Sequence, residues 1–318
     1  MAGIRIEFAQ FGDFDTFDIL RSDSPMGIGA LPSPLVTGLT TMYYVDTSVV
    51  EGSTYYYRVV VWRDGVSQVS DELHVIANSD PYYSYVTSLL HFNGANGSSI
   101  FVDEILGNWI NVGSPTITTS QSKFGGASGK IDSSASGGGY IKRSATTAYT
   151  FSTSEDFTIE CWLRIPTSAT FISNVVPLVC VGAMNLDSSY GGWNLLLFDT
   201  SSATMRLEKD LTNGTAISQS LAYGTALPRD TWIHIEIGRS SGEVYGFIGG
   251  VLLGSTSAFS GVDLTNPNSL PVYIGTGNNG IFENNWPLTG FIDDLRVTKG
   301  ICRNTTAFTP PVYQHPDQ

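Results

Sequence analysis

Two adjacent aspartates, Asp293 and Asp294, interrupt an apolar strand pattern near the end of the chain, in the stretch GFIDDLRV. Successive side chains of a strand point to opposite faces. The alternation therefore predicts that Asp293 shares a face with Leu295, while Asp294 lies on the other face with Arg296. On this basis the two carboxylates cannot act together as acid and base. Asp293, on the apolar face, needs a cation or several hydrogen-bond donors, and Asp294 is expected to be a surface charge.

A loop rich in asparagine, residues 276–290, precedes this strand and has a composition that suits sugar binding. It contains Asn284, Asn285 and Trp286. Amides both donate and accept hydrogen bonds, and an indole face can stack on the apolar side of a sugar ring. The alternative is a hairpin loop in which Trp286 is a local packing anchor. Trp193, in YGGWNLLLF, has the same two interpretations.

The stretch DFTIECWLRI places Glu160, Trp162 and Arg164 on one strand face. A charged pair beside a tryptophan could hold a sugar, but cross-strand packing of Trp162 is the favoured interpretation.

Histidine spacing gives no sign of a metal site or a catalytic triad. No histidine forms a short-range pair with cysteine or another histidine, and no Ser-His-Asp signature is recognisable. His234 alternates with isoleucines and should face away from the core. The four histidines are His74, His91, His234 and His315.

The elements that must position these residues are strands. Turn residues recur at short intervals, and no long span keeps a helical period, which predicts an all-β fold. The pattern breaks at ANSDPYYSY. We therefore predict a first domain over 1–78, a linker over 79–85, and a second domain over 86–318.

The amino-acid composition excludes some classes of function. Charged residues make up 14% of the chain, aromatic residues 12%, and the formal net charge is −13. Such a chain can build a core but would be repelled by nucleic acid and anionic membranes. The N-terminus lacks the pattern of a secretion signal. Three cysteines are too few for a disulfide framework, although a Cys161–Cys180 bridge stays open.

The first domain resembles a fibronectin type III domain. A tyrosine enters a strand directly after a Gly-Ser-Thr corner, as in the tyrosine corner of such sandwiches. The residues that carry the resemblance are Gly52, Thr54, Tyr55, Tyr57 and Val59.

The second domain resembles the phage branch of the laminin-G-like, concanavalin A-like jelly rolls. The blocks LLHFNGANGSS, QSKFGGAS and GFIDDLRVTKGICRNTTAFTPP, with the strands between them, occur in the order expected of that family. The resemblance covers most of 86–312 and implies a two-sheet antiparallel sandwich in a virion protein.

Two site expectations follow from this resemblance. Calcium-binding relatives supply one aspartate from a closing strand, and Asp293 matches that aspartate, which implies a structural Ca²⁺; backbone hydrogen bonding is the alternative. Glucanases of this fold use a Glu-x-Asp-x-(x)-Glu strand motif with carboxylates about 5 Å apart. That spacing is absent here, since the nearest clusters are 155–160 and 208–210.

We therefore predict a non-enzymatic virion protein of a tailed phage, made in the host cytoplasm. A tail-fibre or tail-tip accessory protein fits best, with other virion proteins and host surface glycan as partners and with no membrane insertion. Self-association into a homo-oligomer is compatible with the sequence. The alternatives are a capsid decoration or head-fibre protein with adhesive sandwich domains, and a glycan hydrolase with an unrecognised site.

Overall fold

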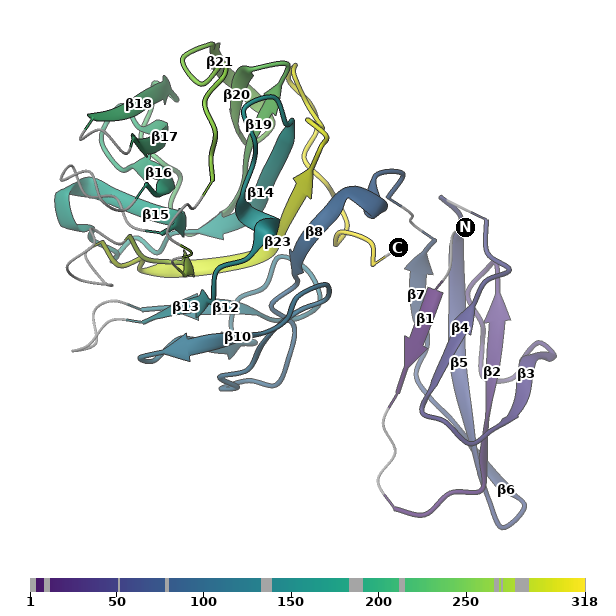
Figure 1. The fold of residues 1–318 in the computed structure, drawn as a ribbon. Coiled ribbons are helices and arrows are strands. Elements are labelled where there is room, and N and C mark those ends of the chain that lie inside the picture. The colour runs from purple at the N-terminus through teal and green to yellow at the C-terminus, as the bar shows by residue number, and fades with distance from the viewer. Residues whose placement is uncertain are drawn as a thin grey trace. The chain divides into compact units, whose positions relative to one another are not determined.

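A computed structural model describes the chain except for residues 1–3, 9–11, 51, 78–79, 133–138, 183–190, 212–214, 266–268, 270, 278–285 and 318. It divides into two compact units, Met1–Ser84 with Pro316–Gln318, and Tyr85–His315 (Figure 1). Throughout the described residues, helix is confined to three short 3₁₀ turns, η1 (Tyr83–Tyr85), η2 (Thr147–Tyr149) and η3 (Ile172–Asn174). The all-β fold class is confirmed. No helix in the described ranges is long and apolar enough to cross a membrane.

The smaller unit contains two sheets. Strand β1 (Ile4–Glu7) pairs with β4 (Tyr43–Asp46), and a five-stranded sheet lies opposite. Its strands are β2 (Thr16–Ser22), β3 (Pro34–Leu39), β5 (Thr54–Arg63), β6 (Val66–Val69) and β7 (Leu73–Ile76). Alternating apolar residues of both sheets, among them Ile6, Ile19 and Tyr57, form its core.

The corner before β5 has the geometry expected of a tyrosine corner. Gly52 adopts a φ of +78°, a conformation that glycine tolerates best. The Tyr55 hydroxyl then accepts a hydrogen bond of 2.9 Å from the backbone amide of Val50. This bond from the strand back to the preceding corner ties the corner to β5.

The larger unit contains two eight-stranded antiparallel sheets. The first sheet runs in the order β18 (Thr215–Ala222), β17 (Thr204–Leu211), β16 (Trp193–Phe198), β15 (Val175–Val181), β22 (Val272–Ile274), β13 (Tyr140–Arg143), β10 (Gly107–Val112) and β9 (Phe101–Asp103). The second runs β11 (Thr116–Thr118), β12 (Ser128–Ile131), β23 (Gly290–Lys299), β14 (Phe157–Arg164), β19 (Trp232–Ser240), β20 (Glu243–Ile248) and β21 (Val251–Thr256), and β8 (Val86–Leu90) also pairs with β23.

The main core lies between these two sheets. On β14, for example, Ile159, Cys161 and Leu163 point inward, and on β19 Ile233, Ile235 and Ile237 do the same. Period-two alternation explains this burial, because one face of each strand meets the opposite sheet. All three cysteines are among the described residues and none forms a disulfide, which removes the Cys161–Cys180 bridge.

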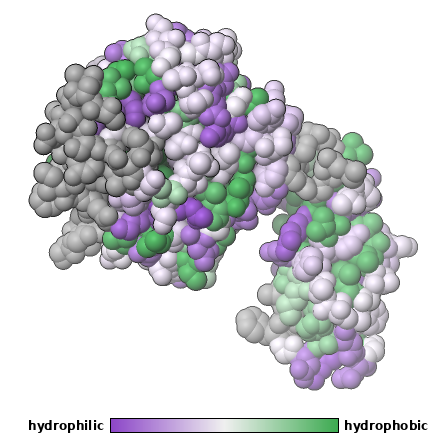
Figure 2. Space-filling model, in the orientation of Figure 1, coloured by the Kyte–Doolittle hydropathy of each residue, from purple (hydrophilic) through white to green (hydrophobic). Residues whose placement is uncertain are grey.

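The other face of the second sheet is covered by the chain itself. After β23, residues 301–315 run back across β14 and β19 (yellow in Figure 1). The tail therefore packs along this sheet. On the visible surface of Figure 2 apolar residues form only small separate groups, as is usual for folded domains.

Candidate functional site

A dense group of buried titratable side chains lies beneath this C-terminal segment, on the outer face of the second sheet. Glu160 of β14 is at its centre and is 2% exposed. Its Oε1 accepts hydrogen bonds from Nε and Nη2 of Arg296, at 3.0 and 2.7 Å. Its Oε2 lies 3.2 Å from Nε2 of His234. Arg296 and His234 come from β23 and β19, so the two neighbouring strands clamp the carboxylate between them.

A β-bulge brings both aspartates to this same face. Glu160 pairs with Arg296 and Trp162 pairs with Asp293, so Cys161 alone faces Asp294 and Leu295. Asp294 has a φ of +49°, and the extra residue resets the alternation of β23. The prediction of opposite faces is therefore wrong.

Asp294 is a buried member of the cluster and not the surface charge that its spacing from Arg296 predicted. Its Oδ1 lies 2.7 Å from Nδ1 of His91, and its Oδ2 accepts a 2.9 Å hydrogen bond from the backbone amide of His315. Burial alone would raise the pKa of Asp294, but His315 and His91 outweigh it and hold that pKa below its ordinary value.

Opposite charges fix the ionisation of Glu160. Burial would raise its pKa, but Arg296, with His315 and His234, holds the pKa well below the ordinary value. Burial lowers the pKa of His315 to about 4, so this imidazole is neutral at pH 7 and Arg296 is the permanent positive partner. Burial, and then the charge of Glu160, raise the pKa of the neighbouring Glu236 well above its ordinary value.

The C-terminal segment closes this cluster from solvent. The amide of Asn304 donates to both carboxylate oxygens of Glu236 at 3.0 Å. The ring of Phe308 packs edge-on against His234, with centroids 5.7 Å apart. Gly250 lies so close beneath the segment that an added Cβ would stand 2.1 Å from the carbonyl oxygen of Phe308. The carboxylates are therefore inaccessible to a polymer chain.

Asp293 satisfies the hydrogen-bonded alternative that the sequence left open. Its Oδ2 accepts from the backbone amides of Lys123 and Phe124 at 2.7 and 3.2 Å. Its Oδ1 and the indole Nε1 of the cross-strand Trp162 have no hydrogen-bond partner in the described part of the chain. Burial raises the pKa of Asp293 to about 7 although the two amides oppose this. Structural calcium at Asp293 stays a prediction.

The structure places the residues predicted to bind sugar in three different environments. Trp193 is fully buried in the core, where its Nε1 donates to the carbonyl of Tyr149 at 3.1 Å, so it has no face for a sugar. Trp286 is half-buried, and its ring rests on Gly277, where a Cβ would meet it at 2.4 Å. Asn284 and Asn285 lie outside the described residues.

Sequence reasoning missed the role of the histidines. His91, His234 and His315 lie far apart along the chain, yet all three reach Glu160 or Asp294. Only the pairing of β8, β14, β19 and β23 and the return of the tail bring them together. One signal was present in the sequence, since strict alternation forces one of the two adjacent aspartates onto the apolar face, and an extra residue in the strand removes that conflict.

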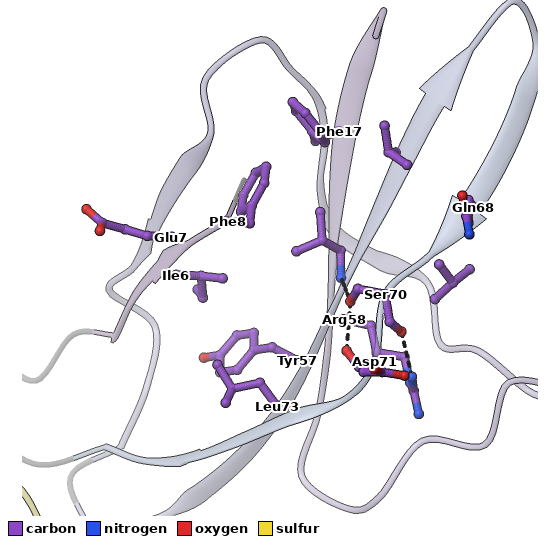
Figure 3. A pocket seen from close by; sticks show the side chains of 13 residues that line it. Ile6, Glu7, Phe8, Phe17, Tyr57, Arg58, Gln68, Ser70, Asp71 and Leu73 are labelled. Atoms are coloured by element: carbon purple, nitrogen blue, oxygen red, sulfur yellow. Dashed lines mark hydrogen bonds between the residues drawn. The ribbon is translucent and has the colours of Figure 1, made fainter. Parts of the chain in front are cut away.

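A separate pocket of about 360 Å³ lies in the smaller unit. Figure 3 shows Ile6, Phe8, Phe17 and Tyr57 directed toward its interior from both sheets, and the Phe8 and Phe17 ring centroids are 4.7 Å apart. The lining thus consists mainly of the inner, apolar faces of the sandwich. We interpret this pocket as an incompletely filled core.

Comparison with known families agrees with this architecture. Residues 135–302, more than half of the chain, match the family model of the concanavalin A-like lectin/glucanases superfamily. The chain belongs to this superfamily. The superfamily takes its name from two activities, sugar binding and glucan hydrolysis, and the fold by itself does not decide between them. No curated protein gives a significant match to the sequence.

Solved structures resemble this superfamily member only distantly. Domain 4 of the arabinanase AbnA from Geobacillus stearothermophilus, solved with arabinotriose, is 15% identical at a TM-score of 0.46, with coverage of 68% of this chain and 92% of that domain. The binding domain of botulinum neurotoxin serotype G is 16% identical at 0.48, with coverage of 69% and 48%. The enzymatically active domain of bacteriophage CBA120 tailspike protein 2 is 14% identical at 0.47, with coverage of 70% and 32%. Similarity at this level does not extend to a shared ligand or activity.

Proposed function

We propose that this chain is a carbohydrate-binding protein without hydrolytic activity and that it forms part of a phage particle, as a tail-fibre or tail-tip component that attaches to surface glycan. The superfamily leaves a lectin or a glucanase as the two main choices. The inaccessibility of the Glu160 and Glu236 carboxylates favours a lectin.

The observation that carries the proposal is the burial of the Glu160–Glu236 pair. These carboxylates oppose each other on adjacent strands, as a glycosidase pair would. Hydrolysis requires them to flank a bound glycosidic bond. Here Glu160 is bound by Arg296 and Glu236 by Asn304, and the C-terminal segment lies over both. A sugar chain would have to displace that segment to reach them.

We propose that sugar binds the larger unit at Trp286. Its indole is half-buried and supported from below by Gly277, and the backbone amide of Gly277 donates to the carbonyl of Trp286 at 3.2 Å. A ring held by backbone contacts and still partly exposed is suited to stacking against a pyranose.

A glycan-binding measurement with matched tryptophan variants tests this assignment. We expect the full chain to bind immobilised bacterial surface polysaccharide and Trp286→Ala to bind at least about 10-fold more weakly, since loss of an aromatic contact of 1.4 kcal/mol is tenfold. Trp232→Ala, at another half-buried tryptophan of the same unit, is the control and should bind normally. Release of reducing ends from the polysaccharide by the wild-type chain would contradict the non-enzymatic assignment.

Placement in a phage particle is supported by the ordered sequence blocks that end in GFIDDLRVTKGICRNTTAFTPP. Immunogold labelling of purified particles should place the protein on the tail in a few to about a dozen copies. Labelling of the head in many copies would favour the capsid decoration alternative. Absence from purified particles would contradict both.

A further inference from the structure

Glu160, His234 and His315 form a compact ligand set beneath the C-terminal segment. One nitrogen or oxygen atom from each lies within 4.8 Å of the others, and all three residues are buried. Glu160 Oε2 is 3.2 Å from His234 Nε2 and 3.6 Å from His315 Nε2. Two imidazoles and a carboxylate are a donor set typical of zinc.

These separations agree with tetrahedral coordination. Zinc binds histidine nitrogen and carboxylate oxygen at about 2.0–2.2 Å, and ligands at tetrahedral angles then stand roughly 3.3–3.5 Å apart. The two separations from Glu160 Oε2, 3.2 and 3.6 Å, bracket that range. The third separation, between the two imidazole nitrogens, is within 4.8 Å, so the imidazoles would close toward each other around the ion.

His315 supplies independent support. Its Nε2 is buried and lacks a hydrogen-bond partner within the described chain, yet two carboxylate oxygens lie 3.6 and 3.7 Å away. An unsatisfied buried nitrogen is costly.

The surrounding groups orient the carboxylates in the manner of outer partners at metal sites. Arg296 and Arg303 approach Glu160 at Oε1, and Oε2 lies beside the two imidazoles. His91 holds Oδ1 of Asp294, and Oδ2 of Asp294 stands 3.7 Å from His315 Nε2. The negative charges of Glu160 and Asp294 offset the two guanidinium groups, so a cation does not enter a net positive site.

We propose that Glu160 Oε2, His234 Nε2 and His315 Nε2 bind a divalent transition-metal ion of the Zn²⁺ class, with water as fourth ligand, and that this ion fastens the C-terminal segment to β14 and β19. Hard cations such as Ca²⁺ prefer all-oxygen sites and should not compete. The site is distinct from the sugar contact at Trp286 and does not depend on it.

Metal binding to the full chain tests the proposal. The protein is stripped with chelator, and Zn²⁺ alone is titrated in a calorimeter. We expect one saturable Zn²⁺ per chain and a rise in Tm, because the ion binds the native state. Co²⁺ should give the visible absorption of a four-coordinate site. Trypsin should cleave the C-terminal segment more slowly with Zn²⁺ present.

Substitution of the ligands should remove the site. Loss of an outer partner alone weakens metal binding 10–100-fold, so His315→Gln and His234→Gln should each weaken it by more than about 100-fold. His74→Gln changes an exposed histidine of the smaller unit and should bind Zn²⁺ as the wild type does. His315 lies in irregular backbone after β23 and not in a strand, so a circular dichroism spectrum identical to wild type is expected for His315→Gln.

Three results would overturn the proposal. The first is the lack of saturable Zn²⁺ binding by the wild-type chain. The second is equal binding by His315→Gln and the wild type. The third is Ca²⁺ binding as tight as Zn²⁺ binding that His315→Gln abolishes; Ca²⁺ binding that this variant keeps would belong to Asp293.

Discussion

Replacement of Arg296 by methionine should expose how much the larger unit depends on its buried ion pair. Arg296→Met keeps most of the apolar volume of the side chain and removes the guanidinium. Glu160 then keeps Oε2 against His234, but Oε1 loses two hydrogen bonds of 2.7 and 3.0 Å. At pH 7 Glu160 is ionised, because its pKa lies well below the ordinary value.

The size of the loss follows from burial. The two side chains are 7% and 2% exposed, so solvent cannot compensate the charge that remains. Breaking a buried pair by removing one partner costs about 3–5 kcal/mol. Arg303 already lies 3.6 Å from the same oxygen and can take over part of the role, so we expect a value near 3 kcal/mol. For a unit of this size that corresponds to a fall in Tm of about 6–12 °C.

Urea unfolding followed by tryptophan fluorescence measures this loss, since five of the six tryptophans lie in the larger unit. The double variant Glu160→Gln with Arg296→Met should regain at least half of it, because no buried charge is then left unpaired. Lys130→Met is the control, since its pair with Asp132 is 45% and 33% exposed and should be worth less than about 1 kcal/mol. The reasoning is refuted if Arg296→Met matches the control, or if the double variant is no more stable than the single one.

Three further changes have definite expected outcomes. The pKa of Asp293 rises on folding to about 7, so between about pH 4 and 7 the native state holds a proton that the unfolded state has lost, and the free energy of unfolding falls as the pH rises through that range. Asp293→Asn should lack this fall in a pH series of unfolding free energies. Parallel curves for the variant and the wild type would contradict it. Gly250→Ala places a Cβ 2.1 Å from the carbonyl oxygen of Phe308, so it should loosen the C-terminal segment and speed its proteolysis, whereas Gly224→Ala, a positive-φ glycine with open space, should not. Tyr57→Phe removes a 2.8 Å hydrogen bond to the buried Asp46 and should lower the unfolding free energy of the smaller unit by about 1–3 kcal/mol; an unchanged transition midpoint would contradict it.

Much of the architecture follows from local sequence. Period-two alternation assigns the inward residues of β14 and β19, and the observed core contains those residues. The corner residues before Tyr55 predict the hydrogen bond that the structure contains. These features depend on neighbours in the chain, and a pattern of one or two strands is sufficient to specify them.

The candidate site could be predicted only in part. Asp293 was singled out correctly as a carboxylate that needs donors, and Lys123 and Phe124 provide them. The strand face of Asp293 was predicted wrongly, because the in–out alternation of side chains along a strand holds only up to a bulge, which shifts it by one residue. Trp193 is a residue type that can stack on a sugar, but here it is fully buried. Its burial depends on packing against the opposite sheet, which the sequence of its own strand does not reveal.

The sequence by itself therefore determines that this is an all-β protein of jelly-roll type, acidic, with strands whose inward faces can be read from their alternation. Only the tertiary structure decides that Glu160, Asp294, His234 and His315 meet, because they lie on three strands and a returning tail. Side-chain periodicity is a property of each strand, whereas register, bulges and strand order are fixed by the free energy of packing the whole sandwich.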